Sequence, residues 1–578
     1  MTPLRRLLAA LRTPLWISRL VMLVGVVTVA SALMPAVHAR LHLVYEMVPD
    51  VFPAAADTGA AAVGVILVVL GCALRRGKFR AWLLATVLSA TAVVLHLLKG
   101  LDVEAAALCL LLTVLLLRAR GEFTARTDMR SRSRLLAVLV VGPLVATGLG
   151  FGRLTLVDAG QADGTTAGQR LAEAFLGLVG IPGPVVFTRP EKADQAAVAL
   201  AVLGAIVLLL AVLAAMRPPG GPHRPDAGER DRLRGLLAKW GWMDSLGYFA
   251  LREDRYVIFE PAGRAAISYR VVGGVTLAGG DPIGEPAAWG DAIAAWLAEA
   301  RAYGWTPAAL GSSERGATAF HRAGLECLEL GDEAVVRTAE FSLSGRPMRG
   351  VRQAVARCQR AGITVAVNRT SDLTPAELAE VGAKADEWRD GQVERGFSMA
   401  LGRLGDPQDG EAVLVRAFGP DGLAGLLHLV PWGPEGLSLD LMRRSRGGEN
   451  GIVETMVAGL MAAAPRLGVE RVSLNFAVFR SVFARGERLG AGPVLRLWRG
   501  ILLWVSRFWQ IESLYRANAK YQPEWVPRYL VFAASGDLPR IATAALRAEA
   551  FLVMPTLGRR RRPGAGPATG PEESATVA

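Results

Sequence analysis

The chain has 578 residues, of which 52% are hydrophobic, and a formal net charge of +13. Because a single core rarely exceeds about 250–300 residues, the length predicts several domains. The four cysteines are scattered, two of them inside apolar runs, which excludes a disulfide framework and a cysteine metal cluster. The basic charge predicts an anionic partner, namely lipid headgroups, nucleic acid or both.

Apolar residues are concentrated before Met216, in six runs that approach or exceed the roughly 20 residues that a helix needs to cross a bilayer. The runs are Trp16–Val37, Phe52–Leu74, Ala81–Leu98, Val103–Leu117, Leu135–Phe151 and Gln195–Met216. We therefore expect residues 1–217 to form an α-helical membrane bundle of about six spans. The fourth and fifth runs are short, so their true ends can differ from these bounds.

Basic and acidic residues around these runs predict the orientation of the bundle. Arginines precede the first run and follow the second and fourth, whereas the loops between them carry acidic residues such as Asp50 and Asp102. The positive-inside rule then places both ends of the bundle in the cytoplasm, and an even number of spans agrees. The first run is long and more runs follow it, unlike a cleaved signal peptide. The sequence predicts a multi-pass plasma-membrane protein whose remaining half is cytoplasmic.

A linker rich in proline and glycine, residues 218–230, separates the two halves. Helical and strand patterns alternate after it, first in residues 231–345 and again in residues 346–556, which predicts α/β domains with mixed sheets. The predicted strands are Tyr256–Glu260, Ile267–Val272, Val275–Ala278, Ala308–Leu310, Leu325–Leu330, Ile363–Asn368, Leu423–Val430, Leu437–Arg443 and Arg471–Phe476. The predicted helices are Arg232–Trp240, Ala287–Tyr303, one that begins near Glu314, Arg346–Ala361, Thr374–Arg389, Gly451–Ala464 and Val478–Arg488. The basic composition of residues 557–578, rich in proline, glycine and alanine, predicts a disordered tail.

One further segment, Val494–Ile511, combines three tryptophans with three arginines. Its apolar content is high for a surface helix, and its arginines are too frequent for a membrane span. A helix at the membrane interface and a core helix with arginines at its edge both explain this composition.

The sequence Asp440-Leu-Met-Arg443 stands at the end of a predicted strand. In regular strand geometry Asp440 and Met442 share a face, so Asp440 and Arg443 point apart unless the chain bends there. The residues alone favour a strand-end ion pair. An aspartate at a substrate site would suit the positive charge of an amino acid.

Two short motifs in the first α/β set have simple structural explanations as well as functional ones. Ser312-Ser-Glu314 is typical of a helix N-terminus, where a serine caps the helix and a glutamate favours its dipole. Gly279-Gly-Asp281-Pro-Ile-Gly284 is typical of a turn. No Walker motif or dinucleotide fingerprint accompanies them, so we expect no nucleotide cofactor and no metal.

Two later motifs are basic. The loop from Arg443 to Gly451 contains three arginines and three glycines and leads into a predicted helix. It can be a solvated loop, or its arginines and the backbone amides at the helix start can hold a phosphate. Further on, Lys520-Tyr-Gln-Pro-Glu-Trp-Val-Pro-Arg528-Tyr contains two prolines and several aromatic residues, which indicates a rigid extended segment. Such a segment can simply close the domain, or its cations can meet phosphate.

Taken together, these motifs and Ser473-Leu-Asn475-Phe-Ala resemble those of the aminoacyl-phosphatidylglycerol synthases, whose best-known members are the phosphatidylglycerol lysyltransferases. The resemblance covers about Arg232 to Val531. Glu454, where many relatives have aspartate, and Asn475-Phe476 are similar to the actinobacterial branch. In that branch the synthase is joined to a lysyl-tRNA synthetase, and we expect no such synthetase here because the chain ends in its Pro-, Gly- and Ala-rich tail.

The resemblance implies two fused GNAT-type acyltransferase folds and a set of site residues. It implies that Asp440 and Arg443 contact the aminoacyl group and that Glu314 acts near the acceptor hydroxyl as a general base. The implied substrate-binding residues are Ser313, Asp281, Asn475, Lys520 and Arg528, of which Lys520 and Arg528 would meet phosphate. No cofactor or metal is implied.

The implied activity is transfer of an aminoacyl group, lysyl before others, from aminoacyl-tRNA to the glycerol hydroxyl of phosphatidylglycerol. The modified lipid would reduce the negative charge of the membrane and favour resistance to cationic peptides. Two other hypotheses stay open from the sequence. One is an acyltransferase that acts on a peptidoglycan precursor or a small amine, and the other is an inactive membrane-anchored scaffold that binds lipid or tRNA.

Overall fold

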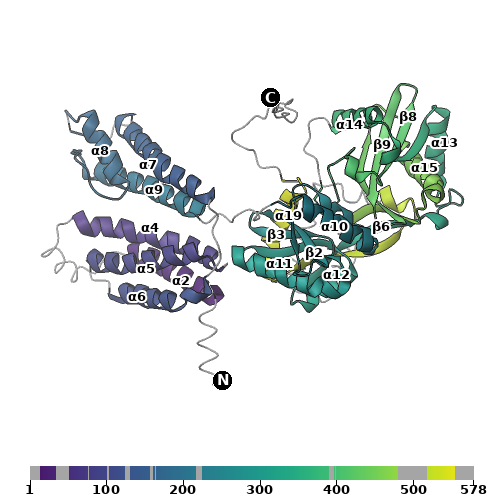
Figure 1. Cartoon of the computed structure of the whole chain (residues 1–578). Coiled ribbons are helices and arrows are strands. Elements are labelled where there is room, and N and C mark those ends of the chain that lie inside the picture. The colour runs from purple at the N-terminus through teal and green to yellow at the C-terminus, as the bar shows by residue number, and fades with distance from the viewer. Residues whose placement is uncertain are drawn as a thin grey trace, which may run out of the picture.

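The computed structural model of the chain describes residues 14–33, 51–75, 77–100, 103–123, 130–156, 161–162, 164–215, 224–389, 396–397, 399–478 and 517–552. Within these residues an all-helical half precedes a mixed α/β half (Figure 1). The predicted helix Val478–Arg488, the segment Val494–Ile511 and the tail at 557–578 lie outside the described residues.

Helices occupy all six of the predicted apolar runs. They are α2 (Pro14–Leu33), α4 (Val51–Leu74), α5 (Phe79–Gly100), α6 (Val103–Arg118), α7 (Arg130–Leu156) and α9 (Pro190–Ala215). In the part of the chain that the structure describes, four helices are long and apolar enough to cross a membrane, namely α2, α5, α7 and α9. A shorter helix, α8 (Ala167–Gly177), lies in the predicted loop between the last two runs, where Thr166 and Gln169 form a capping box.

Glycines allow helices α2 and α4 of the helical half to pack closely against each other. A Cβ added to Gly25 of α2 would lie 2.7 Å from the carbonyl oxygen of Gly64 in α4, and the reverse holds for Gly64. Two backbones can pack this closely only where side chains are absent. Helices α2, α4, α5 and α6 form one group around a shared apolar cluster, and α7, α8 and α9 form a second group (Figure 1).

The mixed half is built on one twelve-stranded sheet. Its main path has the order β1-β2-β3-β5-β12-β6-β11-β10-β9-β8-β7, with β4 paired to β2. The strands are β1 (Tyr256–Phe259), β2 (Ala265–Val272), β3 (Val275–Gly279), β4 (Ile283–Gly284), β5 (Thr306–Ser312), β6 (Glu326–Arg337), β7 (Thr364–Arg369), β8 (Val413–Gly419), β9 (Gly422–Pro431), β10 (Gly436–Arg444), β11 (Arg471–Val478) and β12 (Glu524–Phe532). Most neighbours are antiparallel, and the two parallel pairs are β3 with β5 and β10 with β11.

Four strands differ most from the sequence prediction. Strand β4 lies in the segment Gly279–Gly284, which was predicted as a turn. Strand β6 is twelve residues long and continues through Gly331 to Arg337, well beyond its predicted end at Leu330. Strand β8 was not predicted, and β12 was predicted only as an extended closing segment. Although β12 comes from the second predicted set of elements, it lies between β5 and β6 of the first set. The two sets are therefore joined through one continuous sheet.

Helices cover both faces of this sheet (Figure 1). In the first part, α11 (Trp289–Tyr303) and α12 (Glu314–Arg322) pack around Trp296 and Phe320, while α19 (Leu538–Ala548) covers the opposite face. In the second part, α13 (Arg349–Arg360) and α15 (Ile452–Leu467) pack against one face and α14 (Pro375–Arg389) against the other. Helix α10 (Ala227–Trp240) begins before its predicted start at Arg232, because Asp226 caps it.

Candidate functional site

A bulge in β10 brings the predicted pair Asp440 and Arg443 to one cavity. The register of β10 against β9 shifts between Leu439 and Leu441, so Asp440 is the extra residue. A bulge bends the strand and changes the direction of the side chains that follow it. Both Asp440 and Arg443 consequently line the same cavity of about 440 Å³, together with residues of α14 and of the segment before β8. The bend that the sequence left open is present.

Two neighbours hold the Asp440 carboxylate. The backbone N–H of Leu401 donates to its Oδ1 at 2.5 Å, and Nδ1 of His428 lies 2.6 Å from its Oδ2. The side chain of Asp440 is only 5% exposed and that of His428 only 1%. A largely buried carboxylate is stable as an anion only when such donors surround it.

Two other carboxylates on this cavity are paired with arginines. Asp254 lies 2.7 Å from Nε of Arg252 and 3.0 Å from Nη1 of Arg270, and Asp386 lies 2.9 Å from Nη2 of Arg389. Burial alone would raise the pKa of Asp254, but the two arginines hold it below its usual value.

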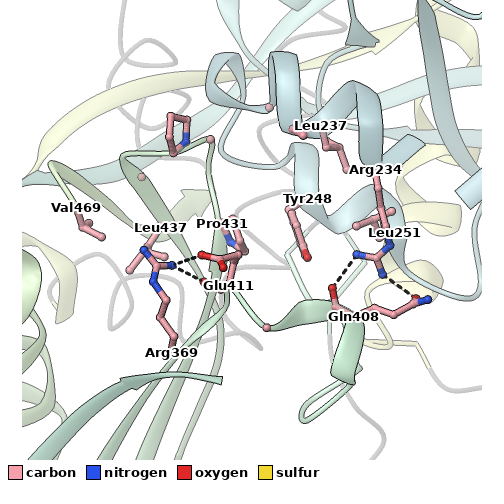
Figure 2. A pocket seen from close by; sticks show the side chains of 16 residues that line it. Arg234, Leu237, Tyr248, Leu251, Arg369, Gln408, Glu411, Pro431, Leu437 and Val469 are labelled. Atoms are coloured by element: carbon pink, nitrogen blue, oxygen red, sulfur yellow. Dashed lines mark hydrogen bonds and ion pairs between the residues drawn. The ribbon is translucent and has the colours of Figure 1, made fainter. Parts of the chain in front are cut away.

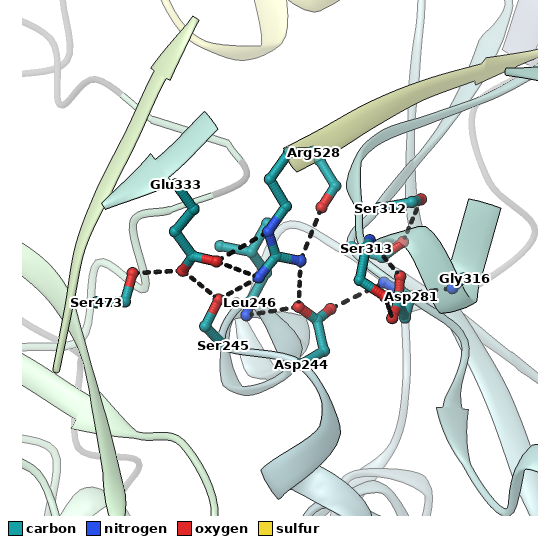
Figure 3. A network of polar contacts seen from close by, with 12 residues as sticks. Asp244, Ser245, Leu246, Asp281, Ser312, Ser313, Gly316, Glu333, Ser473 and Arg528 are labelled. Atoms are coloured by element: carbon teal, nitrogen blue, oxygen red, sulfur yellow. Dashed lines mark hydrogen bonds and ion pairs between the residues drawn. The ribbon is translucent and has the colours of Figure 1, made fainter. Parts of the chain in front are cut away.

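Arg528 lies at the centre of a buried polar network rather than on the surface (Figure 3). Its Nε and Nη2 donate to Glu333 Oε2 at 2.9 and 2.5 Å, and its Nη1 donates to Asp244 Oδ1 at 2.7 Å. Burial lowers the pKa of Arg528, but Glu333, Asp244 and Asp281 together raise it above its usual value. We expected Arg528 to meet a phosphate, but the structure gives its guanidinium these internal partners.

The same network fixes the strands that carry the candidate site. The hydroxyls of Ser245 and Ser473 both donate to Glu333, and Ser438 donates to the carbonyl oxygen of Ser245 at 2.7 Å. Ser438 and Ser473 are also the last pair in the parallel register of β10 and β11. Asp440 follows two residues later, so the network anchors the chain directly before the bulge.

Asp281 and Ser313, both predicted to bind substrate, contact each other, but Glu314 stands apart. Ser313 donates its backbone N–H to Asp281 Oδ1 at 2.8 Å and its hydroxyl to Oδ2 at 2.5 Å. Ser313 also accepts from the N–H of Gly316 and so caps α12. Glu314 is exposed in the first turn of α12 and does not line the Asp440 cavity. The capping interpretation of Ser-Glu is thus confirmed.

Lys520 is engaged by a carboxylate of the neighbouring helix. Its Nζ lies 2.5 Å from Glu454 Oε1, and both side chains are partly exposed. Burial opposes ionisation of Glu454, yet the hydrogen bond from Lys520 lowers the pKa of Glu454 below its usual value. Asn475 belongs to β11, at the shift in register between Ser473 and Phe476, and its side chain lies outside the described residues.

A second cavity, of about 510 Å³, lies between α10 and the β9–β10 hairpin. Figure 2 shows Arg234 of α10 bound to Gln408, and Arg369 paired with Glu411, on its wall. Tyr248 donates to Asp409 at 2.7 Å beside it. The residues that line this cavity include none of the predicted site residues, so the Asp440 cavity is the candidate site.

Comparison with known families agrees with the motifs. The family model described as the C-terminal region of phosphatidylglycerol lysyltransferase matches residues 234–532, which is more than half of the chain. The chain belongs to the phosphatidylglycerol lysyltransferase family. A second model, described as the transmembrane region of lysyl-tRNA synthetase, matches residues 10–215.

Among curated relatives, the lysylphosphatidylglycerol biosynthesis bifunctional protein LysX of Rhodococcus opacus is 44% identical over 539 residues, which cover 91% of this chain and 47% of the relative. The protein of the same name from Mycobacterium avium is 45% identical over 551 residues, which cover 92% of this chain and 46% of the relative. The chain spans about half the length of the curated relatives it matches. These relatives confirm the expected actinobacterial branch.

A solved structure, that of L-PGS from Bacillus licheniformis, matches with a TM-score of 0.50 and 22% sequence identity, over 57% of this chain and 98% of that one. At this identity the likeness shows a shared fold of the mixed half.

The sequence had pointed to Asp440 and Arg443 but missed His428, Asp244 and Glu333. The only local signal for His428 was a single polar residue inside the apolar run Leu426–Val430.

We predict that Arg528→Met destabilises the protein strongly. The change leaves Asp244 and Glu333 buried without a cation, which typically costs about 3–5 kcal/mol. Arg337→Met is the matched control, because Arg337 lies on β6 and forms an exposed pair with Glu524, with side chains 54% and 51% exposed. Removing an exposed pair should cost at most about 1 kcal/mol. Denaturant unfolding of the full chain in detergent measures both, and equally small losses would refute a structural role for Arg528.

A second prediction concerns Asp281, whose pKa burial and the nearby Asp244 raise from its usual 3.8 to about 7. The folded protein then holds this proton to a higher pH than the unfolded chain. The stability that this site contributes is therefore complete below about pH 4 and is lost as the pH rises through about 7. Asp281→Asn imitates the protonated carboxyl. The melting temperature of this variant minus that of wild type should therefore increase between pH 4 and pH 7.5. Asp291→Asn, at an exposed aspartate of α11, should follow wild type at every pH, and an identical pH slope in Asp281→Asn would contradict the assignment.

Proposed function

We propose that the chain is an aminoacyltransferase that moves an aminoacyl group, lysyl before others, from aminoacyl-tRNA to the glycerol hydroxyl of phosphatidylglycerol. The observation that carries this proposal is the cavity that Asp440 and Arg443 share, in a chain of the phosphatidylglycerol lysyltransferase family. The printed names of the relatives, which refer to lysylphosphatidylglycerol biosynthesis, support the same substrate.

The reaction in this proposal exchanges one ester for another. The glycerol hydroxyl oxygen attacks the carbonyl carbon of the aminoacyl ester, the bond from that carbon to the ribose oxygen breaks, and the hydroxyl proton ends on the released ribose hydroxyl. Asp440 holds an ammonium group of the amino acid, while Arg443 faces the negative charge that develops on the carbonyl oxygen. Because the donor ester is already activated, holding the two substrates together supplies much of the acceleration.

For the membrane half we propose six spans with both ends in the cytoplasm. Six helices on the predicted apolar runs and the arginines that follow the second and fourth runs support this arrangement. A cavity of about 610 Å³ is lined by Ser18 and Arg75 of the helical half and by Arg301, Trp305 and Arg540 of the mixed half. Contact at this arginine-rich end supports a cytoplasmic mixed half, where aminoacyl-tRNA is available.

We also propose that the mixed half consists of two fused GNAT-type folds. Each part of the sheet contains one parallel pair among antiparallel neighbours, β3 with β5 and β10 with β11, and this internal similarity supports the proposal. The strands β12 and β6 then form the seam between the two folds.

Helix α13 and the loop after β10 supply a basic surface for the tRNA. Arg349, Arg352, Arg357 and Arg360 are all exposed on α13, whose opposite face buries Val351, Ala354 and Cys358. Arg357 donates to the carbonyl oxygen of Asn450, so this helix packs on the loop that follows Arg444 and contains Arg446. That loop begins next to Arg443. The end of a tRNA whose phosphates are bound on α13 could therefore reach the Asp440 cavity.

Production of the modified lipid tests the proposed function directly. We predict that a host without aminoacylated lipids gains a ninhydrin-positive phosphatidylglycerol derivative when it expresses the chain, and that Asp440→Asn abolishes it. Loss of a charge-assisted contact made in the transition state should lower the rate about a hundredfold or more. Asp291→Asn serves as the control. A modified cell-wall peptide in place of the lipid would indicate the first rival activity, and no product of either kind would indicate a scaffold.

The tRNA surface makes a separate prediction. The double variant Arg349→Glu/Arg360→Glu should raise KM for aminoacyl-tRNA with little change in kcat, because phosphate contacts bind ground and transition states alike. The salt dependence of tRNA binding should also weaken. The slope of the logarithm of the binding constant against the logarithm of the salt concentration should fall by about one for each lost phosphate contact. Arg315→Glu/Arg322→Glu on α12, which makes the same charge change at other exposed positions, should leave both quantities unchanged. Equal effects of the two double variants would indicate only general attraction of a basic protein for RNA.

A further inference from the structure

His428 lies behind Asp440 and does not line its cavity. It is on β9, directly opposite Leu414 of β8 and Leu441 of β10, and it is fully buried. Its Nδ1 is 2.6 Å from Asp440 Oδ2. Its Nε2 is buried and has no hydrogen-bond partner among the residues that the structure describes. One ring nitrogen is therefore committed to the carboxylate and the other faces an apolar environment.

This asymmetry decides which ring nitrogen donates. With its proton on Nδ1 the imidazole donates to Asp440 and leaves only an unused lone pair at Nε2. The other tautomer would place a buried, unpaired N–H at Nε2 and an acceptor against the carboxylate, which is more costly. Nδ1 is therefore the donor to Asp440.

The carboxylate is also held from its other side. Leu401 donates its backbone N–H to Oδ1, so the two oxygens have one fixed donor each. Each oxygen of a carboxylate can accept more than one hydrogen bond, so both retain capacity for a ligand in the cavity. A carboxylate whose orientation is fixed by surrounding donors binds a cation without first having to become ordered.

We propose that His428 is a positioning residue for the aminoacyl site, which acts by donating from Nδ1 to Asp440 and so keeps this carboxylate oriented toward an ammonium group of the substrate. The proposal deepens the proposed aminoacyl transfer and rests on it. The ligand class is a primary ammonium, such as the α-amino or side-chain amino group of an aminoacyl ester.

Two substitutions at His428 separate this role from packing. In His428→Asn the amide nitrogen stands near the position of Nδ1 and can still donate to Asp440. In His428→Leu the side chain has a similar volume and suits its leucine neighbours, but the donor is lost. Both variants should therefore fold, with melting temperatures within about 5 °C of wild type.

The first measurement is lysyl transfer by the purified full chain in phosphatidylglycerol vesicles. We expect His428→Leu to lower kcat/KM by about ten- to a hundredfold, the usual effect of losing a hydrogen bond to a charged group, and His428→Asn to stay within about threefold. Charged groups that share the cavity with Asp440 are unchanged in both variants, namely Arg252, Glu253, Asp254, Asp386, Arg389 and Arg443.

The second measurement does not depend on transfer. Lysine methyl ester, a small mimic of the aminoacyl end, should raise the melting temperature of wild type and His428→Asn, but not that of His428→Leu or Asp440→Asn. Absence of transfer by wild type, with this binding pattern intact, would refute the proposed function and leave the role of His428 standing. Failure of the ester to stabilise wild type, or equal stabilisation of all four proteins, would overturn the role of His428. In the transfer assay, wild-type kinetics in His428→Leu, or equal impairment of both folded variants, would overturn it as well.

Discussion

The buried contact between Arg528 and two carboxylates is the constraint on which the mixed half depends. Asp244, Glu333 and Arg528 come from segments that are far apart in the chain, and each is almost completely removed from water. Without the guanidinium, Glu333 and Asp244 would share a buried site with Asp281 close to Asp244. Their mutual repulsion and desolvation would oppose formation of this part of the sheet. Insertion of β12 between β5 and β6 supplies the missing positive charge. The first set of strands therefore cannot complete its sheet until the end of the second set is present.

Irregular strand pairing gathers around this contact. Strand β12 shifts register next to Arg528, β11 shifts after Ser473, and β10 shifts at Asp440. A bulge costs regular hydrogen bonds, so it persists where surrounding contacts define it. Here Ser438 and Ser473, through Ser245 and Glu333, hold β10 and β11 just before their shifts. The bulge that directs Asp440 to the cavity is thus supported by the same charges that join the sheet.

The contrast between predicted and observed strands has the same origin. Strands such as β2, β3 and β9 are apolar along most of their length, so their local pattern predicts them. The pattern of β6 ends at Leu330, because Gly331, Asp332 and Glu333 look like a turn, and distant partners of Glu333 such as Arg528 stabilise it inside a buried strand. Strand β8 has a readable local pattern, Val413-Leu-Val-Arg-Ala-Phe, and could have been predicted.

The candidate site shows the same division between local and distant signals. Motifs identified Asp440 and Arg443, but regular alternation would separate them, since a bulge depends on cross-strand pairing that one strand does not encode. The relation of His428 to Asp440 likewise appears only when β9 and β10 are aligned as a hairpin. The role of Arg528 could not be read from its motif, because a buried arginine and a phosphate-binding arginine look alike in sequence.

The pairing of charges also explains how a chain with a net charge of +13 can offer a binding site to a cation. On the cavity wall, Asp254 and Asp386 are matched by arginines, which cancel most of their field. Asp440 differs because its close side-chain partner is the imidazole of His428 and not an arginine. Its negative charge is therefore not cancelled by a fixed cation at hydrogen-bond distance. Arginines on α13 can attract a polyanion over a long range, while the low dielectric around Asp440 makes its attraction for an ammonium strong and local. The two kinds of recognition can operate together because one acts through the exposed surface and the other through a carboxylate shielded from it.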